Sequence, residues 1–112
     1  LYVQAHQTSA RYPAEVSEFE AVGLTPCYSE RHPAPYVAES PLRIGLAFRE
    51  QHLIHANDTI LVIGQIVEVQ VASGVIGADG FVDMEKTGTL AGSGLDGYYR
   101  AEKVGRVGYA RV

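Results

Sequence analysis

Two segments in the middle of the chain alternate between apolar and polar residues. The first is PLRIGLAFRE at residues 41–50, with apolar side chains at Leu42, Ile44, Leu46 and Phe48. The second is TILVIGQIVEVQV at residues 59–71. Period-two alternation is typical of strands, and the intervening Asn57 and Asp58 favour a tight turn. The pattern predicts two long antiparallel strands joined by a hairpin.

The second strand changes character along its length. Strict alternation places these residues on one face: Leu61, Ile63, Gln65, Val67, Val69 and Val71. The other face begins apolar and ends polar: Ile60, Val62, Gly64, Ile66, Glu68 and Gln70. The strand is therefore expected to enter a sheet buried on both sides and to leave it with one side in water. A barrel or another closed sheet meets that requirement.

The remaining segments predict short elements. Pro13 opens a helical pattern through Ala21, with acidic residues in its first turn and Gly23 suited to the C-terminal cap. Four prolines predict that residues 24–41 are extended and contain no helix. Asp83 is expected to cap a short helix through Lys86. The glycine-rich residues 88–97 predict a flexible loop, residues 98–105 one or two helical turns, and residues 107–112 a final extended piece.

Composition narrows the class of protein. A chain of 112 residues is at most one domain, and two long strands are too few to close a barrel. We therefore interpret residues 1–112 as a single domain that is the C-terminal portion of a larger fold, or as one that needs a second chain.

The net charge is −4 without a basic run, which disfavours nucleic acid and anionic membranes as partners. Cys27 is the only cysteine, and no segment is long and apolar enough to span a bilayer, so a cytoplasmic location is expected.

Four segments, taken in order, resemble the flavin reductase-like family, FMN-binding split barrels related to flavoredoxin. They are HQTSARYPAEVSEFEAVGLTP, PYVAESPLRI, NDTILVIGQIVEVQV and the tail FVDMEKTGTLAGSGLDGYYRAEKVGRVGYARV. The resemblance covers the later part of the family's domain. It implies a mainly β fold, a Greek-key split barrel with short peripheral helices, that pairs as a homodimer. It also implies FMN as cofactor, NAD(P)H as electron donor, and an electron-accepting partner or small-molecule acceptor.

With this resemblance, the expected function is that of an FMN-binding oxidoreductase transferring hydride from NAD(P)H to FMN. The alternative is a flavin- or ligand-binding barrel without turnover, acting as a store, sensor or dimerisation module. The chemistry would belong to the cofactor, so no catalytic triad or metal cluster is expected. His32, His52 and His55 lack metal-ligand spacing with one another or with Cys27.

Residues near the N-terminus are candidates for flavin binding. His6, Thr8 and Ser9 lie in the stretch that the family writes with a Thr-Ser pair before an aromatic-Pro step, and their polar groups can bond phosphate or flavin carbonyls. The alternative is that Thr8 and Ser9 only cap the turn into the following helix. Arg11 is expected in a surface ion pair with the acidic helix, and Glu39 in a structural hydrogen bond to a loop.

The C-terminal segment supplies two further candidates. Tyr99 and Arg100 follow the glycine-rich loop, where an aromatic ring can cover the flavin or stack on nicotinamide and a guanidinium can meet a phosphate. The alternative is that Tyr98 and Tyr99 anchor the C-terminal segment on the barrel. Thr59 stands where the family's smaller reductases carry a histidine, so the Asn57–Asp58 turn is interpreted as structural only.

Overall fold

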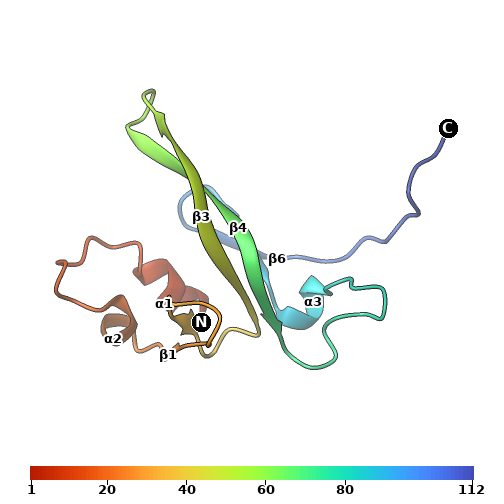
Figure 1. The fold of residues 1–112 in the computed structure, drawn as a ribbon, viewed down its shortest axis with the longest axis horizontal. Coiled ribbons are helices and arrows are strands. Elements are labelled where there is room, and N and C mark those ends of the chain that lie inside the picture. Colours follow the sequence, from red (N-terminus) through yellow and green to blue (C-terminus); the bar gives the residue numbers. More distant parts are fainter. The chain divides into compact units, whose positions relative to one another are not determined.

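A computed structural model describes residues 1–112, which divide into two compact units, 1–72 and 73–112. Figure 1 shows the elements of both. The first unit contains α1 (Tyr2–Gln7), α2 (Glu18–Val22), β1 (Pro26–Cys27), β2 (Tyr36–Val37), β3 (Leu42–Ile54) and β4 (Thr59–Val71). The second contains α3 (Met84–Thr87), β5 (Leu90–Ser93) and β6 (Gly97–Arg100). None of the three helices is long and apolar enough to cross a membrane.

The predicted hairpin is confirmed. Strands β3 and β4 have 13 residues each and pair antiparallel from Leu42–Val71 to Ile54–Thr59. The turn between them spans residues 55–58, and Asp58 adopts a left-handed conformation with φ 53°. Aspartate tolerates this region better than most residues, as the sequence predicted. The Thr59 hydroxyl donates to the Asn57 side-chain oxygen over 2.7 Å and closes the turn.

Two irregularities in the pairing change which residues share a face. The register shifts between Gly45 and Leu46, where β4 has an extra residue, Val67, and again between Phe48 and Glu50, where β3 has Arg49 as the extra residue. An extra residue reverses the alternation of the strand beyond it. Residues directly opposite each other lie on one side. The paired positions therefore define a largely apolar face, which we call the apolar face: Leu42, Ile44, Leu46, Phe48, Gln51 and Leu53 on β3, with Ile60, Val62, Gly64, Ile66, Val69 and Val71 on β4.

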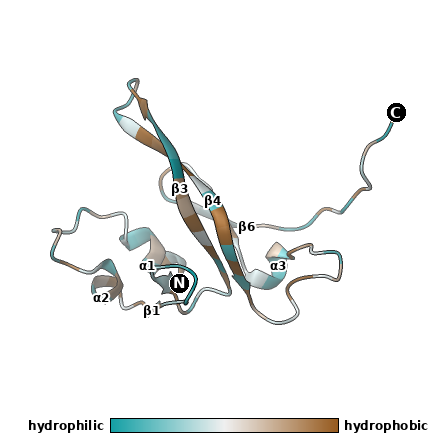
Figure 2. Ribbon diagram, viewed as in Figure 1, coloured by the Kyte–Doolittle hydropathy of each residue, from teal (hydrophilic) through white to brown (hydrophobic).

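The sequence-based assignment of faces on β4 was therefore wrong. Strict alternation separated Ile66 from Val69, whereas the bulge at Val67 brings both to the apolar face. Figure 2 shows the concentration of hydrophobic residues along both strands. The face opposite the apolar face is mixed. It carries Arg43, Gly45, Glu68 and Gln70 near the start of β3, and Glu50, His52, Ile54, Leu61 and Ile63 near the turn.

Burial also differs from the expectation. We expected β4 to start in a sheet covered on both sides, but Ile60 and Val62 near its start are more than half exposed. The sheet has only two strands, so no neighbouring strand flanks that end. The polar end, expected in water, is instead half-buried at Glu68 and Gln70, because residues 28–38 lie over it and bond to both strands.

The N-terminal helices differ partly from the prediction. Residues 2–7 form α1, which sequence reasoning did not find, and α2 begins at Glu18 rather than at Pro13. Ser17 is extended and ends the single turn started by Pro13, because serine favours the N-cap position over the helix interior. Gly23 caps α2 in a left-handed conformation, as predicted. The Gln4 amide donates to the Val22 and Gly23 carbonyls and joins the two helices.

Residues 24–41 contain no helix, as predicted. Their only regular structure is the short pair β1–β2, in which Cys27 lies opposite Tyr36. Leu24 and Tyr36 are the buried hydrophobic residues of the first unit. We call residues 28–38 the strap, because they run over the polar end of the β3–β4 hairpin.

Two of the predictions for residues of the second unit were wrong. Asp83 caps α3 by accepting the Glu85 amide, as expected. Residues 88–97, however, are no loop, because they supply β5 and the start of β6, which pair antiparallel. Residues 98–105 form no helix either. Tyr98–Arg100 continue β6, and the following chain is held by ion pairs from Lys103 to Asp83 and from Arg106 to Asp79. Residues 101–112 have no regular secondary structure.

Candidate functional site

A polar network lies between the strap and the base of the β3–β4 hairpin. Glu68 on β4 accepts hydrogen bonds from the Ser29 hydroxyl over 2.6 Å and from the Tyr36 hydroxyl over 2.8 Å. Ser29 also accepts from the backbone amides of Arg31 and His32. One carboxylate thus organises residues from both ends of the strap. Charge-assisted bonds of this length are the stronger class of hydrogen bond.

Gly45 makes this arrangement possible. It lies directly opposite Glu68 in the hairpin, and it is buried. A Cβ at residue 45 would overlap the Tyr36 hydroxyl and lie 3.1 Å from the His32 ring. The His32 ring is tilted over the Tyr36 ring at 5.2 Å between centroids, and its nitrogens face the Ala34 and Leu46 carbonyls at 3.2 Å. The absent side chain therefore creates the space that the two rings fill.

The network shifts the pKa of both of its ionisable members. Hydrogen bonds from Ser29 and then Tyr36 lower the pKa of Glu68 below its usual range. Partial desolvation, followed by the adjacent Glu68 carboxylate, raises the pKa of Tyr36. At neutral pH the carboxylate is ionised and the phenol is protonated, which is the pair of states that the hydrogen bond requires.

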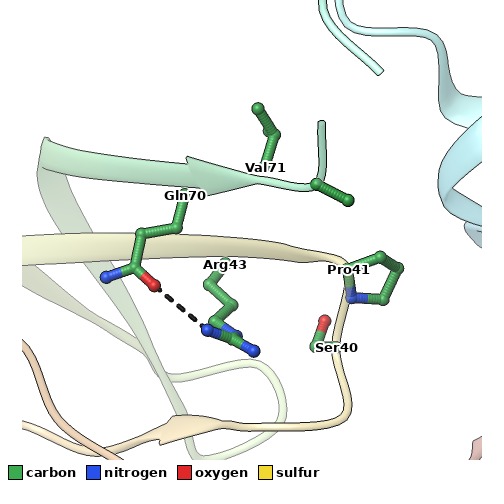
Figure 3. Close-up of a pocket in the computed structure, with 6 residues that line it drawn as sticks. Ser40, Pro41, Arg43, Gln70 and Val71 are labelled. Carbon is green, nitrogen blue, oxygen red and sulfur yellow. Dashed lines mark hydrogen bonds between the residues drawn. The ribbon is translucent and has the colours of Figure 1, made fainter. Parts of the chain in front are cut away.

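Arg43 extends the network to the end of the hairpin. Its guanidinium donates to the Val37 carbonyl over 3.0 Å, to the Ala38 carbonyl, and to the Gln70 side-chain oxygen over 3.2 Å. Arg43 and Gln70 border a cavity of about 230 Å³, shown in Figure 3, which is lined by Ser40, Pro41, Arg43, Gln70, Val71 and Ala72. Every direct acceptor of Arg43 is neutral, so the side chain fastens the strap to the hairpin without an ion pair.

Glu39 has the structural role that the sequence predicted. Its carboxylate accepts the Thr25 amide over 3.0 Å and so links the two ends of residues 25–39. Hydrogen bonds from Thr25 lower its pKa below the usual range, and the positive charge of Arg43 contributes. A carboxylate held ionised in this way stabilises a loop and is poorly suited to acid–base chemistry at neutral pH.

The N-terminal candidates lie together at the end of α1. The Thr8 hydroxyl donates to the Ala5 carbonyl, and the Ser9 hydroxyl to the His6 carbonyl, each over 2.7 Å. Both hydroxyls therefore cap the preceding helix, not the following one. Thr8 also lines a cavity of about 200 Å³ with Glu18, Phe19, Leu24 and Val37. Contact of His6, Thr8 and Ser9 with a flavin stays a prediction.

Arg11 makes no ion pair with the acidic residues that follow it, which corrects the expectation from the sequence. Glu18 lies beyond the break in helical structure at Ser17, so the helical spacing assumed for such a pair is absent. The guanidinium of Arg11 is exposed.

The C-terminal candidates lie on β6 in the second unit. Arg100 is opposite Leu90 and Tyr99 is opposite Ala91, and consecutive strand residues point to opposite faces. They therefore present their side chains to different surfaces of this small hairpin. Arg100 borders a cavity of about 320 Å³ with Glu85, Gly88, Thr89, Ala101 and Glu102. Two glutamates at this cavity oppose an anion there, and a ligand role for Tyr99 or Arg100 stays a prediction.

Sequence reasoning missed the residues that the structure brings together most closely: Ser29, Tyr36, Arg43, Glu68 and Gln70. One signal was present. Glu68 and Gln70 occupy alternate positions of a strand, and Arg43 and Gly45 have the same spacing on its partner. Pairing the two strands in the observed register places all four residues on one side of the sheet. What the pattern could not supply was the strap segment that covers them.

The family of the chain is decided by comparison with known proteins. Residues 3–87 match the model of the flavin reductase like domain, which is most of the chain. The chain belongs to the flavin reductase-like family. A comparison with curated proteins gives no match.

Solved structures of flavin reductase-like proteins agree with this assignment. A protein from Shewanella frigidimarina described as a flavin reductase with a split barrel domain is 48% identical, with a TM-score of 0.90 over 97% of this chain and 55% of its own. Flavoredoxin of Desulfovibrio vulgaris is 30% identical, with a TM-score of 0.69 over 91% of this chain and 54% of its own.

Nitrilotriacetate monooxygenase component B from Bacillus cereus is 22% identical, with a TM-score of 0.77 over 95% of this chain and 54% of its own, and supports the fold alone. The predicted fold class, a mainly β split barrel with short helices, is confirmed by these structures. The chain spans about half the length of each of them.

The cavities of this chain test whether it encloses a flavin mononucleotide by itself. Sites for ligands of drug-like size usually measure about 300–1,000 Å³. The cavities beside Thr8 and Arg43 measure about 200 and 230 Å³, and the one beside Arg100, at about 320 Å³, contains two carboxylates. The first two cavities are smaller than this range, and the carboxylates of Glu85 and Glu102 in the third would repel the phosphate of the cofactor.

Proposed function

We propose that this chain is part of an FMN-dependent oxidoreductase of the flavin reductase type, in which NAD(P)H transfers a hydride to FMN. The observation that carries the proposal is membership of the flavin reductase-like family, together with 48% identity to a protein described as a flavin reductase. In this proposal the flavin supplies the redox chemistry, and the protein binds and orients it. His6, Thr8 and Ser9 would contact the flavin, and Tyr99 and Arg100 the flavin ring or the dinucleotide.

A cytoplasmic location is part of the same proposal. Cys27 is the chain's only cysteine and is free, so the chain forms no internal disulfide. This agrees with a reducing compartment, in which thiols remain reduced. The reduced flavin would pass its electrons to a partner protein or a small acceptor.

The test is a flavin titration of the purified protein followed by NADH or NADPH under nitrogen. We expect saturable quenching of FMN fluorescence and then loss of the oxidised-flavin absorbance. Ser9→Ala should weaken FMN binding, whereas Ser93→Ala, a matched change on β5, should leave it unchanged. Protein that takes up no FMN, or an equal effect of both variants, would count against the flavin site proposed here.

A second candidate is a flavin-binding module without turnover. Saturable FMN binding without oxidation of either nicotinamide cofactor would select this candidate over the first.

A further inference from the structure

Arg43 carries a positive charge that forms no ion pair within this chain. The side chain is half-buried, and its acceptors, the Val37 and Ala38 carbonyls and the Gln70 side-chain oxygen, are all neutral. The ion pairs of the chain involve other cations. Charges withdrawn from water are usually paired, because neutral acceptors replace only part of the lost solvation. The guanidinium therefore favours an anion as an additional partner.

Glu39 is a carboxylate that this charge influences, but it is already engaged elsewhere. Hydrogen bonds from Thr25 are the main cause of its lowered pKa, and the positive charge of Arg43 contributes to it. Both oxygens of Glu39 accept from the Thr25 amide, over 3.0 and 3.2 Å, and neither forms an ion pair with Arg43. The two charges thus interact at a distance, and the guanidinium has no anionic acceptor in direct contact.

Arg43 also keeps donors for such a partner. A guanidinium has five N–H groups in a planar fork, and the bonds to Val37, Ala38 and Gln70 use three of them. One N–H group therefore remains on each of the two terminal nitrogens. The side chain borders the cavity of about 230 Å³ at the end of the hairpin. A planar fork can donate to both oxygens of one carboxylate, so the residue suits that class of anion.

The charge of its lining distinguishes this cavity from those beside Thr8 and Arg100. Arg43 is the only ionisable residue that lines it, whereas each of the other two cavities includes at least one glutamate. A carboxylate in the lining repels a bound anion, and the repulsion is stronger where water is partly excluded. An anion in the cavity beside Arg43 would meet one positive charge and no negative charge in the lining.

Size and polarity restrict the anion further. A volume of about 230 Å³ corresponds to roughly eight water molecules at about 30 Å³ each, so the ligand has few heavy atoms. Pro41 and Ala72 provide apolar groups that suit a short hydrocarbon chain. The Ser40 hydroxyl donates its hydrogen to the Leu42 carbonyl, so it adds no donor for an anion. A phosphate group, with a charge of about −1.5 to −2, would need more donors than the lining offers.

We propose that the cavity beside Arg43 binds a small organic carboxylate. The two remaining N–H groups of the guanidinium would donate to the carboxylate oxygens, and the hydrocarbon part would contact Pro41 and Ala72. Because Arg43 also donates to the Val37 and Ala38 carbonyls, the bound ligand would hold the end of the strap on the hairpin. The proposal does not depend on flavin reduction. A protein that binds the carboxylate but no FMN supports this inference and contradicts the proposed function, and the reverse result does the opposite.

The test is a titration of the isotopically labelled protein with propionate, followed by the NMR shifts of the Val71 and Ala72 backbone amides. At constant ionic strength we expect saturable shifts with propionate and none with propionamide, its uncharged counterpart. Arg43→Gln should raise the dissociation constant about tenfold or more, because charge-assisted hydrogen bonds are lost. Arg49→Gln is the matched control, since Arg49 is exposed on the same hairpin and does not line the cavity. It should bind propionate like the unchanged protein.

A second variant keeps the test informative if Arg43→Gln loosens the strap. Ala72→Phe fills the cavity from the residue that follows β4 and keeps the guanidinium, so it should weaken propionate binding as well. Three results would overturn the proposed site: no saturable shift with propionate, equal binding of propionamide, or unchanged binding in both cavity variants. Tighter binding of inorganic phosphate would overturn the assignment to carboxylates. Displacement of propionate by FMN would overturn a site separate from the flavin.

Discussion

The two ends of the β3–β4 hairpin differ in the polarity and in the burial of their side chains. At the base, polar side chains on one face are half-buried, and the strap supplies hydrogen-bond partners for Glu68 and Arg43. Near the turn, aliphatic side chains on both faces are exposed. The base is therefore held by contacts within the chain, whereas the far end is exposed.

The difference shows what each kind of interaction can specify. Hydrogen bonds fix particular partners, so Glu68, Ser29 and Tyr36 define one position of the strap. The free energy gained by apolar burial is roughly proportional to the area buried, and any apolar surface of suitable shape can provide it. The base can thus be tested by substitutions that change single contacts, and the far end by substitutions that change the geometry of its turn.

The largest effect on the base is expected from Gly45→Val. A side chain at residue 45 would overlap the Tyr36 hydroxyl and crowd His32, and both would have to leave the polar face. Overpacking of this kind lowers the free energy of unfolding by about 1–3 kcal/mol. Urea unfolding followed by tyrosine fluorescence measures it. Gly92→Val is the control, because a Cβ at residue 92 meets nothing within 4 Å. Equal losses in the two variants would contradict the role given to Gly45.

A smaller loss is expected from Glu68→Gln. The amide has nearly the same shape but no charge, so the bonds from Ser29 and Tyr36 weaken without a change in packing. The midpoint of urea unfolding should fall more than in Glu50→Gln, which removes an exposed carboxylate from the same hairpin. If the two variants have the same midpoint, Glu68 does not hold the strap.

The contribution of Glu68 should depend on pH. Its pKa is lowered in the folded protein, so the folded state favours the ionised form. The stabilisation is then fully present above the ordinary pKa of 4.5 and is lost as the pH falls through the lower folded value. Stability curves of the unchanged protein and of Glu68→Gln should converge in acid. A constant difference down to the lowest measurable pH would exclude this linkage.

The stabilisation contributed by Tyr36 should depend on pH in the alkaline range. Its pKa is raised, so its contribution is present below the ordinary value of 10.0 and is lost as the pH rises through the folded value. Tyr36→Phe should remove this alkaline dependence, as measured by absorbance titration of tyrosinate. If the titration of the variant differed from that of the unchanged protein only by the loss of one tyrosine of ordinary pKa, this role of Tyr36 would be contradicted.

The sequence predicted what depends on local pattern and failed where distant segments meet. The hairpin, the Gly23 cap and the Asp83 cap follow from alternation and from capping preferences, and all three are present. The faces of β4 were wrong because the bulge at Val67 depends on pairing with β3, which one strand's pattern does not contain. Glycines misled the prediction at residues 88–97, where cross-strand hydrogen bonds outweigh a weak local propensity.

The candidate site was predictable only in part. The resemblance identified the family, but it directed attention to hydroxyls at the end of α1 that donate to their own helix. The network at Glu68 joins residues 39 positions apart in the sequence, so no local motif marks it. Tyr99 and Arg100 are adjacent in sequence yet on opposite faces of β6, which a helical prediction for residues 98–105 concealed.

The smallest effect is expected at the turn, which belongs to the far end of the hairpin but is specified locally. Asp58 has φ 53°, a region that glycine adopts without strain and that most other residues avoid. Asp58→Gly should change the free energy of unfolding by only a few tenths of a kcal/mol, because relief of strain offsets the added freedom of the unfolded chain. Asp58→Val should lower it by about 1 kcal/mol or more, since a branched side chain disfavours a left-handed conformation. Urea unfolding of the pair decides the matter, because equal stability of the glycine and valine variants would mean that the turn does not hold this conformation in solution.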